Sequence, residues 1–193
     1  MKKQAIIKQA IIHDLKIDYE TEHRKIKHPR IEFKTGRMLL ILPENYSREK
    51  VLLKKHRDWI HKKLLSIKEA KKDSKRKILE NRNNEELKFI VNSMVEKFSG
   101  ELNVKPQNIH FMILKSKWGS CSAKKRLTFN LLLKYLPEHL VRYVVFHEVL
   151  HLGQKEHDDM FWRLISRKFK DYEKNEKELL AYWFLVQEVI DDD

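Results

Sequence analysis

The sequence predicts an α+β fold in which a small β-sheet packs against helices, preceded by an N-terminal β-rich segment. Residues 5–43 look like strands, and LKIDYETE among them alternates apolar and polar side chains, as a half-buried strand does. Later segments repeat apolar residues at helical spacing. One of them, YVVFHEVLHLG at residues 143–153, is apolar around most of its circumference, which is typical of a buried helix. Strands and buried helices without any internal repeat favour a mixed architecture over a solenoid or an all-α bundle.

Length and composition indicate an ordinary folded protein. The chain has 193 residues, 41% of them hydrophobic, which suffices for one compact domain or one domain with an appendage. The single cysteine, Cys121, excludes an internal disulfide and suits a reducing compartment. Lys8 and Gln9 interrupt the apolar run of the start, MKKQAIIKQAII, so it makes a poor signal peptide. No stretch is long enough to span a membrane, and we expect a cytoplasmic protein without a membrane partner.

The first region, residues 1–82, is expected to contain strands followed by a long basic helix. LKIDYETE alternates as a strand, and IEFKTGRMLLILP reads as a hairpin with Gly36 in the turn. Ser47 is placed to cap a helix that starts REKVLLKKHRDWIHKKLLSIKEA. The polar stretch KKDSKRK after it is expected to be a solvated linker or a fraying end.

The second region, residues 83–193, is expected to pack with the first as one compact unit. EELKFIVNSMVEKFSG is an amphipathic helix that Gly100 is expected to end. IHFMILKSKWGSCSAKKRLTFNLLLKYLP offers two strand-like runs joined by a polar connection. Pro137 is suited to open the apolar helix. Two further helices are predicted at about residues 160–171 and 174–190.

The apolar helix contains three polar residues that require an explanation. An unpaired polar group in such a place costs several kcal/mol, roughly, and a bare charge more. Each helical residue turns about 100°, so His147 and His151 lie one turn apart, within about 40° of each other. Their ring nitrogens can converge on one metal ion, with Glu148 facing the water on its far side. This is the His-Glu-x-x-His arrangement of two zinc ligands and a general base.

His157 is the candidate third ligand. A continuous helix would turn it away from His151, but Gly153 can take the left-handed conformation that ends a helix and lets the chain loop back. Three protein ligands and one water make a catalytic zinc site, whereas a structural site uses four protein ligands. A buried histidine by itself is more often a core residue bonded to a carbonyl. The combination of three histidines, a glutamate and an apolar helix favours one catalytic Zn²⁺ per chain.

A family resemblance extends this interpretation. HEVLHLGQKEHDDMFWRL, with KWGSCS and FNLLLKYLP upstream, resembles the YgjP-like zinc metallopeptidases and, more distantly, the SprT-like ones. The likeness is sharpest over about residues 115–164. It implies a zincin-like core and metal-dependent hydrolysis of peptide bonds, with a protein or peptide as substrate. A downstream glutamate of other zincins resembles Glu178, which is therefore the reserve third ligand.

The chemistry of such a site assigns further roles. Zinc polarises the substrate carbonyl and lowers the pKa of water toward about 7, and Glu148 relays a proton to the leaving amine. The oxyanion needs a second stabiliser, for which Lys117, His139 and Tyr143 are candidates between which the sequence does not choose. A strand near KSKWGSC is suited to pair with an extended peptide.

Two other classes of function remain open at this stage. The net charge of +13 raises the local concentration of acidic partners such as nucleic acid, although no recognition motif is present. A metal-dependent endoribonuclease family shares the histidine spacing but has glycine in place of Glu148. A nucleic-acid-binding module with a structural metal would need a fourth protein ligand, which the sequence does not offer.

Overall fold

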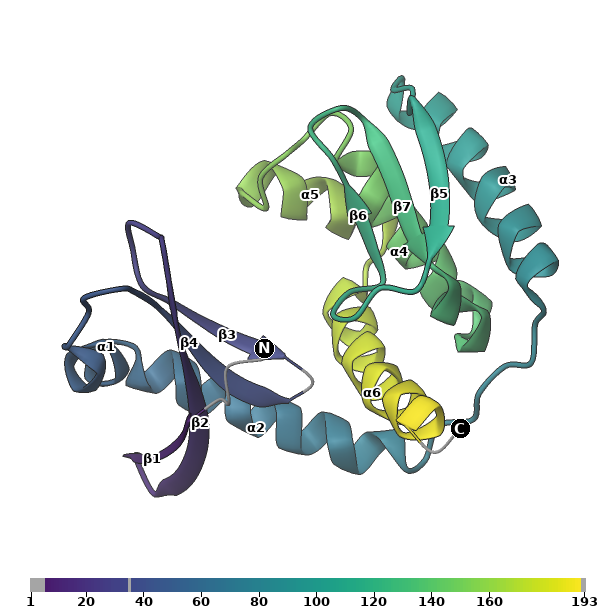
Figure 1. The fold of residues 1–193 in the computed structure, drawn as a ribbon. Coiled ribbons are helices and arrows are strands. Elements are labelled where there is room, and N and C mark those ends of the chain that lie inside the picture. The colour runs from purple at the N-terminus through teal and green to yellow at the C-terminus, as the bar shows by residue number, and fades with distance from the viewer. Residues whose placement is uncertain (1–5, 35, 192–193) are drawn as a thin grey trace. The chain divides into compact units, whose positions relative to one another are not determined.

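The computed structural model describes residues 6–34 and 36–191, so two positions of the expected strands, residues 5 and 35, lie outside it. The chain divides into two compact units, the first ending at Lys72 and the second beginning at Asp73. Each unit has its own sheet, its own helices and its own hydrophobic core. The predicted α+β class is therefore confirmed (Figure 1).

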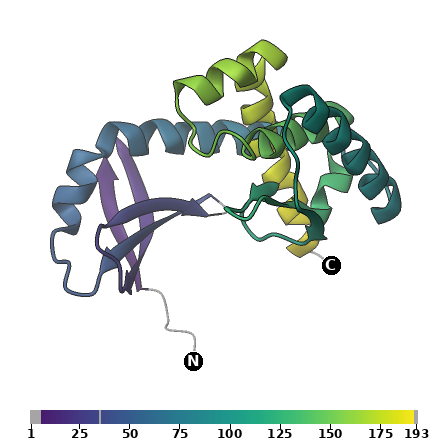
Figure 2. The ribbon, with the colours of Figure 1, turned by 90° about the horizontal axis from the view of Figure 1, so that it is seen from above.

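A four-stranded mixed sheet forms the first unit together with two helices. Its strands lie in the order β1-β2-β4-β3, with β2 parallel to β4 and the other neighbours antiparallel. Gly36, at φ 79°, makes the predicted turn of the last hairpin. Figure 2 shows these strands in purple and dark blue. The strands are β1 (Ile6–Ile12), β2 (Leu15–Arg24), β3 (Arg30–Lys34) and β4 (Arg37–Pro43).

Two helices follow where the sequence predicted one. The segments α1 (Glu49–Lys55) and α2 (Arg57–Ser74) are separated at His56, whose ψ of 14° is not helical. Ser47 does not cap the first of them, because Arg48 occupies the N-cap and forms no side-chain bond there. Apolar residues on both sides of the break, among them Leu53 and Ile60, belong to one core. Buried members of this core include Ile12, Ile17, Tyr19, Met38, Leu40, Leu42, Leu52, Leu53 and Ile60.

The second unit begins with α3 (Asn84–Leu102), which is capped at both ends. The side chain of Asn83 accepts hydrogen bonds from the backbone of Glu85 and Glu86, and the Glu86 carboxylate accepts one in return from the Asn83 backbone. At the other end the prediction was wrong, since Gly100 lies inside the helix. Asn103, at φ 51°, ends it instead, because asparagine tolerates the left-handed conformation.

A three-stranded sheet follows. The strands β5 (Asn108–Met112), β6 (Gly119–Cys121) and β7 (Arg126–Asn130) lie in the order β5-β7-β6. Strand β6 runs antiparallel to β7 and forms an edge of the sheet. It lies in the polar connection between the two predicted runs, at the end of KSKWGSC, where a strand suited to pair with a peptide was expected. A short 3-10 helix, Leu131–Tyr135, leads out of β7.

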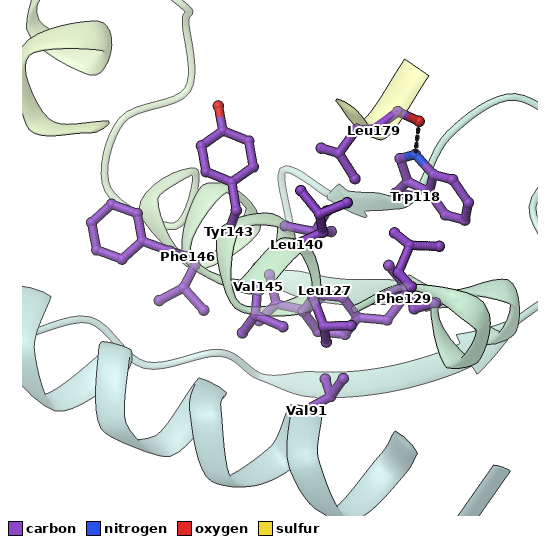
Figure 3. Packing of buried hydrophobic residues seen from close by; sticks show 14 of the residues in the cluster. Val91, Trp118, Leu127, Phe129, Leu140, Tyr143, Val145, Phe146 and Leu179 are labelled. Atoms are coloured by element: carbon purple, nitrogen blue, oxygen red, sulfur yellow. Dashed lines mark hydrogen bonds between the residues drawn. The ribbon is translucent and has the colours of Figure 1, made fainter. Parts of the chain in front are cut away.

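Three helices complete this unit, and the central one is α4 (Glu138–Leu150), which starts directly after Pro137 as predicted. It packs against α3, α6, β6 and β7. Figure 3 shows Leu140 and Val145 of this helix gathered with Leu127, Phe129 and Val91 from its neighbours. No helix among the described residues combines the length and apolar character that crossing a membrane requires. The other two are α5 (Asp159–Lys168) and α6 (Tyr172–Asp191).

Candidate metal centre

The centre of the site is formed by three histidines from the end of α4 and the loop after it. The Nε2 atoms of His147 and His151 lie 3.2 Å apart, those of His151 and His157 3.1 Å, and those of His157 and His147 2.9 Å. Among the described residues they form the one group of three or more His, Cys, Asp or Glu side chains whose ligand atoms converge. The structure thus brings together the three histidines that the sequence singled out.

A zinc ion fits this arrangement of nitrogens. Ligand nitrogens at about 2.0–2.1 Å from one tetrahedral zinc lie about 3.3 Å from each other, within a few tenths of an ångström of the spacing seen here. His151 supports the fit through its other ring nitrogen, because Nδ1 lies 2.9 Å from the carbonyl oxygen of Gln154. A carbonyl oxygen only accepts, so Nδ1 carries the hydrogen and Nε2 presents its lone pair to the centre.

The charge states of the rings also suit a cation. Burial, reinforced by the neighbouring His151 and His157, lowers the pKa of His147 to about 3, so this ring is neutral at pH 7. Burial likewise lowers the pKa of His151. A nitrogen pointing at two other ring nitrogens can direct a hydrogen to only one of them. A bound cation satisfies all three lone pairs at once.

The loop that returns His157 to the centre is held by side chains, not by a left-handed glycine. Gly153 does not adopt a positive φ, so that part of the prediction was wrong. Successive tight turns reverse the chain, with the backbone N–H of Gln154 donating to the Leu150 carbonyl. The Gln154 side chain then donates to Asp158, whose other oxygen caps α5 at Phe161.

Aromatic rings surround the histidines. Phe161 stacks on His151 with ring centroids 4.7 Å apart, and Trp162 stacks on His157 at 5.7 Å. Tyr172 stacks in turn on the far side of Trp162, at 5.4 Å. Sequence reasoning noted Phe161 and Trp162 only as an aromatic pair. The structure shows that they orient two of the three rings.

Glu148 lies beside the histidines and is not one of the converging group. Only 8% of the residue is exposed, and burial raises the pKa of its carboxyl to about 7, although the Lys117 charge opposes that shift. It shares one cleft of about 500 Å³ with the three histidines. A carboxylate at the wall of this cleft can exchange a proton with a molecule bound at the histidines.

Gly119 makes the approach of Glu148 to the sheet feasible, and sequence reasoning assigned it no role. A Cβ on this residue would lie 2.6 Å from Cγ of Glu148 and 3.0 Å from its Cδ and Oε1. Carbon atoms in contact normally stay about 3.5–4.0 Å apart. The only side chain that fits opposite Glu148 is therefore a hydrogen atom. A glycine within a strand is the sequence signal for such an approach.

Two neighbours fix the strand that carries Gly119. Trp118 donates from its indole nitrogen to the Leu179 carbonyl at 3.3 Å, as Figure 3 shows. The buried amide of Asn130 donates to the carbonyls of Leu114 and Lys117, both at 2.9 Å, and accepts from the backbone of the 3-10 helix. These bonds hold the segment before β6 against the core, so the cleft wall has a defined position.

The remaining candidates are placed differently. Lys117 lines the cleft, but His139 and Tyr143 do not. Tyr143 donates to Glu176 at 2.5 Å, and His139 contacts Glu178 at 3.2 Å. Glu178 itself accepts from Lys77 at 2.7 Å and is not part of the histidine group. Of the three proposed substrate contacts, the structure brings only Lys117 to the site.

Comparison with known proteins gives a consistent result. The sequence model of the YgjP-like metallopeptidase domain matches residues 66–182. Among solved structures, the metallopeptidase zymogen jannalysin of Methanocaldococcus jannaschii is similar at 29% identity, over 46% of this chain and 90% of that chain, with a TM-score of 0.41. The zymogen abylysin of Pyrococcus abyssi is similar at 22% identity, over 47% and 92%, with a TM-score of 0.43. No curated protein matched the sequence.

Proposed function

Because the chain belongs to the YgjP-like metallopeptidase family, we propose that it is a zinc-dependent endopeptidase with Glu148 as its general base. One observation carries the proposal. Three Nε2 atoms within 3.2 Å of one another share a cleft with a buried carboxylate that is not itself part of the group. Three protein ligands, with a carboxylate beside them that does not bind the metal, are typical of a hydrolytic zinc site.

The metal is held by the chain's own rings. His147, His151 and His157 would hold Zn²⁺ through Nε2, and one ion per chain is expected. When bound, the ion supplies a Lewis acid that polarises a carbonyl group and lowers the pKa of water. The Nδ1 bond of His151 and the rings stacked on His151 and His157 keep the nitrogens in place before the ion arrives.

Glu148 moves the proton. Its carboxylate accepts a proton from the attacking water and returns it to the nitrogen of the leaving amine. Gly119 allows the carboxylate to lie against β6 at the cleft wall, because it has no side chain to occupy that space. Lys117, the one of the three candidates that lines the cleft, acts on the charge of Glu148 and is suited to contact the substrate on one side of the cut.

The substrate is expected to be an extended polypeptide. Strand β6 lies at the edge of its sheet and lines the cleft through Gly119, Ser120 and Cys121. An extended peptide adds to such an edge through main-chain hydrogen bonds. This mode places an internal peptide bond at the metal centre without requiring either end of the substrate, as an endopeptidase needs.

Metal analysis and cleavage assays test the proposal together. Purified protein should contain about one zinc per chain, and the double variant His147→Ala/His151→Ala should contain none. Glu148→Gln should retain the zinc, because the residue is no ligand, and should lose about 10²–10⁴-fold in the rate of cleavage of an unfolded polypeptide. Glu96→Gln, which removes an exposed carboxylate of α3, is the matched control and should cleave like the parent.

Three results would contradict the proposal. Full zinc occupancy in the double histidine variant would remove the assigned ligands. Parental cleavage rates in Glu148→Gln would make this residue a structural partner instead of a base. Zinc-dependent cleavage of RNA without any cleavage of polypeptide would place the protein in a different class of hydrolase.

A further inference from the structure

One wall of the cleft contains only small side chains. From β6 and the turn after it, the lining residues are Gly119, Ser120, Cys121, Ser122 and Ala123. The rest of the lining consists of Lys117, the metal centre, Glu148 and Lys155 of the loop after α4. With no large apolar group among these residues, the cleft offers little surface that would select a bulky hydrophobic side chain of a substrate. Selectivity must come from another property of the lining.

That property is positive charge. Lys117 and Lys155 line the cleft, and neither forms an ion pair with a described residue. Among the described residues, Glu148 is the only acidic group in the lining. Three exposed basic side chains follow directly after Ala123, two in the turn and one at the start of β7. They are Lys124, Lys125 and Arg126.

This charge is local and does not follow from the basic composition of the whole chain. Residues 73–193 contain 21 Lys and Arg against 19 Asp and Glu, so the unit that contains the cleft is almost balanced. The acidic residues closest to Lys155 in sequence do not line the cleft. Asp158 caps α5 and accepts from Gln154, and Glu156, although its charge acts on His151, is not among the lining residues.

The positions of these charges relative to Glu148 indicate where they would act. Glu148 lies against Gly119, so the scissile bond of a substrate passes near this residue. An extended chain advances about 3.3 Å per residue. Lys117 is then about two residue lengths from the cut in one direction. The end of the wall at Ala123 and the basic turn are about four residue lengths away in the other direction. Lys155 lines the same cleft from the loop after α4.

We infer that this cleft selects acidic polypeptide segments, with Asp or Glu two to four residues from the scissile bond, and that Lys155 is a specificity-determining residue. The inference rests on the proposed peptidase function and names its substrate class. Long-range attraction also speeds the encounter between a basic cleft and an acidic segment.

A binding measurement tests the charge preference without turnover. Zinc-loaded Glu148→Gln protein is titrated with a fluorescent unstructured peptide rich in Glu, and with the same peptide carrying Gln at every Glu. The acidic peptide should bind about tenfold more tightly at low salt.

Adding Lys155→Gln should reduce this ratio about two- to fivefold, the contribution of one exposed charge pair. Adding Lys97→Gln, which removes an exposed lysine of α3 and the same net charge, should leave the ratio unchanged. Equal ratios in the two lysine variants would overturn the inference.

A cleavage experiment separates failure of the inference from failure of the function. The parent and Lys155→Glu are each incubated with a mixed peptide library, and the cut positions are read by mass spectrometry. Asp and Glu should be enriched two to four residues from the cuts of the parent, and the enrichment should fall in the variant. Cuts without enrichment would refute the acidic preference and leave the peptidase intact. Preferential binding of acidic peptides with no cleavage by the parent would refute the peptidase and leave the preference standing.

Discussion

Adding one methyl group at Gly119 should displace Glu148 and leave the three histidines in place, so it tests the contribution of the glutamate's position alone. In Gly119→Ala the new carbon would lie 2.6 Å from Cγ of Glu148. Relief to ordinary contact requires a displacement of about 1 Å or more. Cγ is close to the root of a side chain that a packed helix holds, so the glutamate cannot yield by moving only its far end. Either its side chain rotates away or β6 shifts.

The two consequences have different magnitudes. Overpacking of this kind costs about 1–3 kcal/mol of folding free energy, which a folded domain tolerates. Misplacing a catalytic group by about 1 Å costs about 10²-fold in rate, and complete loss of a general base costs about 10²–10⁴-fold. Gly119→Ala should therefore stay folded and bind zinc like the parent while kcat/KM for an unfolded polypeptide falls at least 10²-fold.

The assay combines zinc content, denaturant unfolding and initial cleavage rates. Gly100→Ala is the matched control, because a Cβ at that helical position meets no atom within 4 Å. It should stabilise the protein by about 0.5–1 kcal/mol and leave activity unchanged. A Gly119→Ala protein that holds zinc and cleaves at the parental rate would refute the reasoning, since Glu148 would then function without the space that Gly119 provides.

Two other substitutions probe the surroundings of the centre. Asn130→Asp removes both hydrogen bonds that the buried amide donates and turns a carboxylate toward two carbonyl oxygens; it should lower the free energy of unfolding by at least about 2 kcal/mol, and unchanged stability in urea would contradict this. Trp162→Leu removes the ring stacked on His157 and should weaken zinc binding about tenfold in a chelator competition. Trp59→Leu, at a ring that packs at a tilt against Phe33 in the first unit, should not weaken zinc binding, and equal affinities in the two variants would exclude the orienting role of Trp162.

The sequence predicted those features that depend on residues close together in the chain, and it failed where distant contacts decide the structure. His147 and His151 are separated by one helical turn, so their convergence follows from the geometry of the helix alone. The break at His56 could not be read in this way, because the helical spacing of apolar residues continues across it from Leu53 to Ile60. The end of α3 could have been at either of two residues that accept the left-handed conformation, Gly100 or Asn103, and the sequence alone did not choose between them.

Strand β6 shows the same limit at the site itself. Its three residues, Gly-Ser-Cys, have no apolar alternation, so nothing in their pattern distinguishes a strand from a loop. What makes them a strand is pairing with β7. The reason for the glycine lies 29 positions away in Glu148, since only the folded chain brings the two together. The sequence motif around Trp118 could be recognised, but the contact between Gly119 and Glu148 could not be inferred from it.

The identity of the third metal ligand depends on contacts between distant residues. Substitution of Glu178 tests whether this residue or His157 is that ligand. Spacing alone cannot choose between His157 and a carboxylate of a later helix. The structure gives Glu178 other partners. Burial by itself would raise its pKa, but Lys77 and His139 outweigh that effect and hold the pKa below its ordinary value. A depressed pKa contributes stability that is present above the unfolded value of about 4.3 and is lost as pH falls through the folded value. Glu178→Gln should therefore keep the full zinc content, unlike His157→Ala. It should also lose about 1 kcal/mol of stability near pH 7 and close that gap to the parent in acid. If zinc is lost from Glu178→Gln while His157→Ala retains it, the carboxylate is the ligand and the assignment of His157 is wrong.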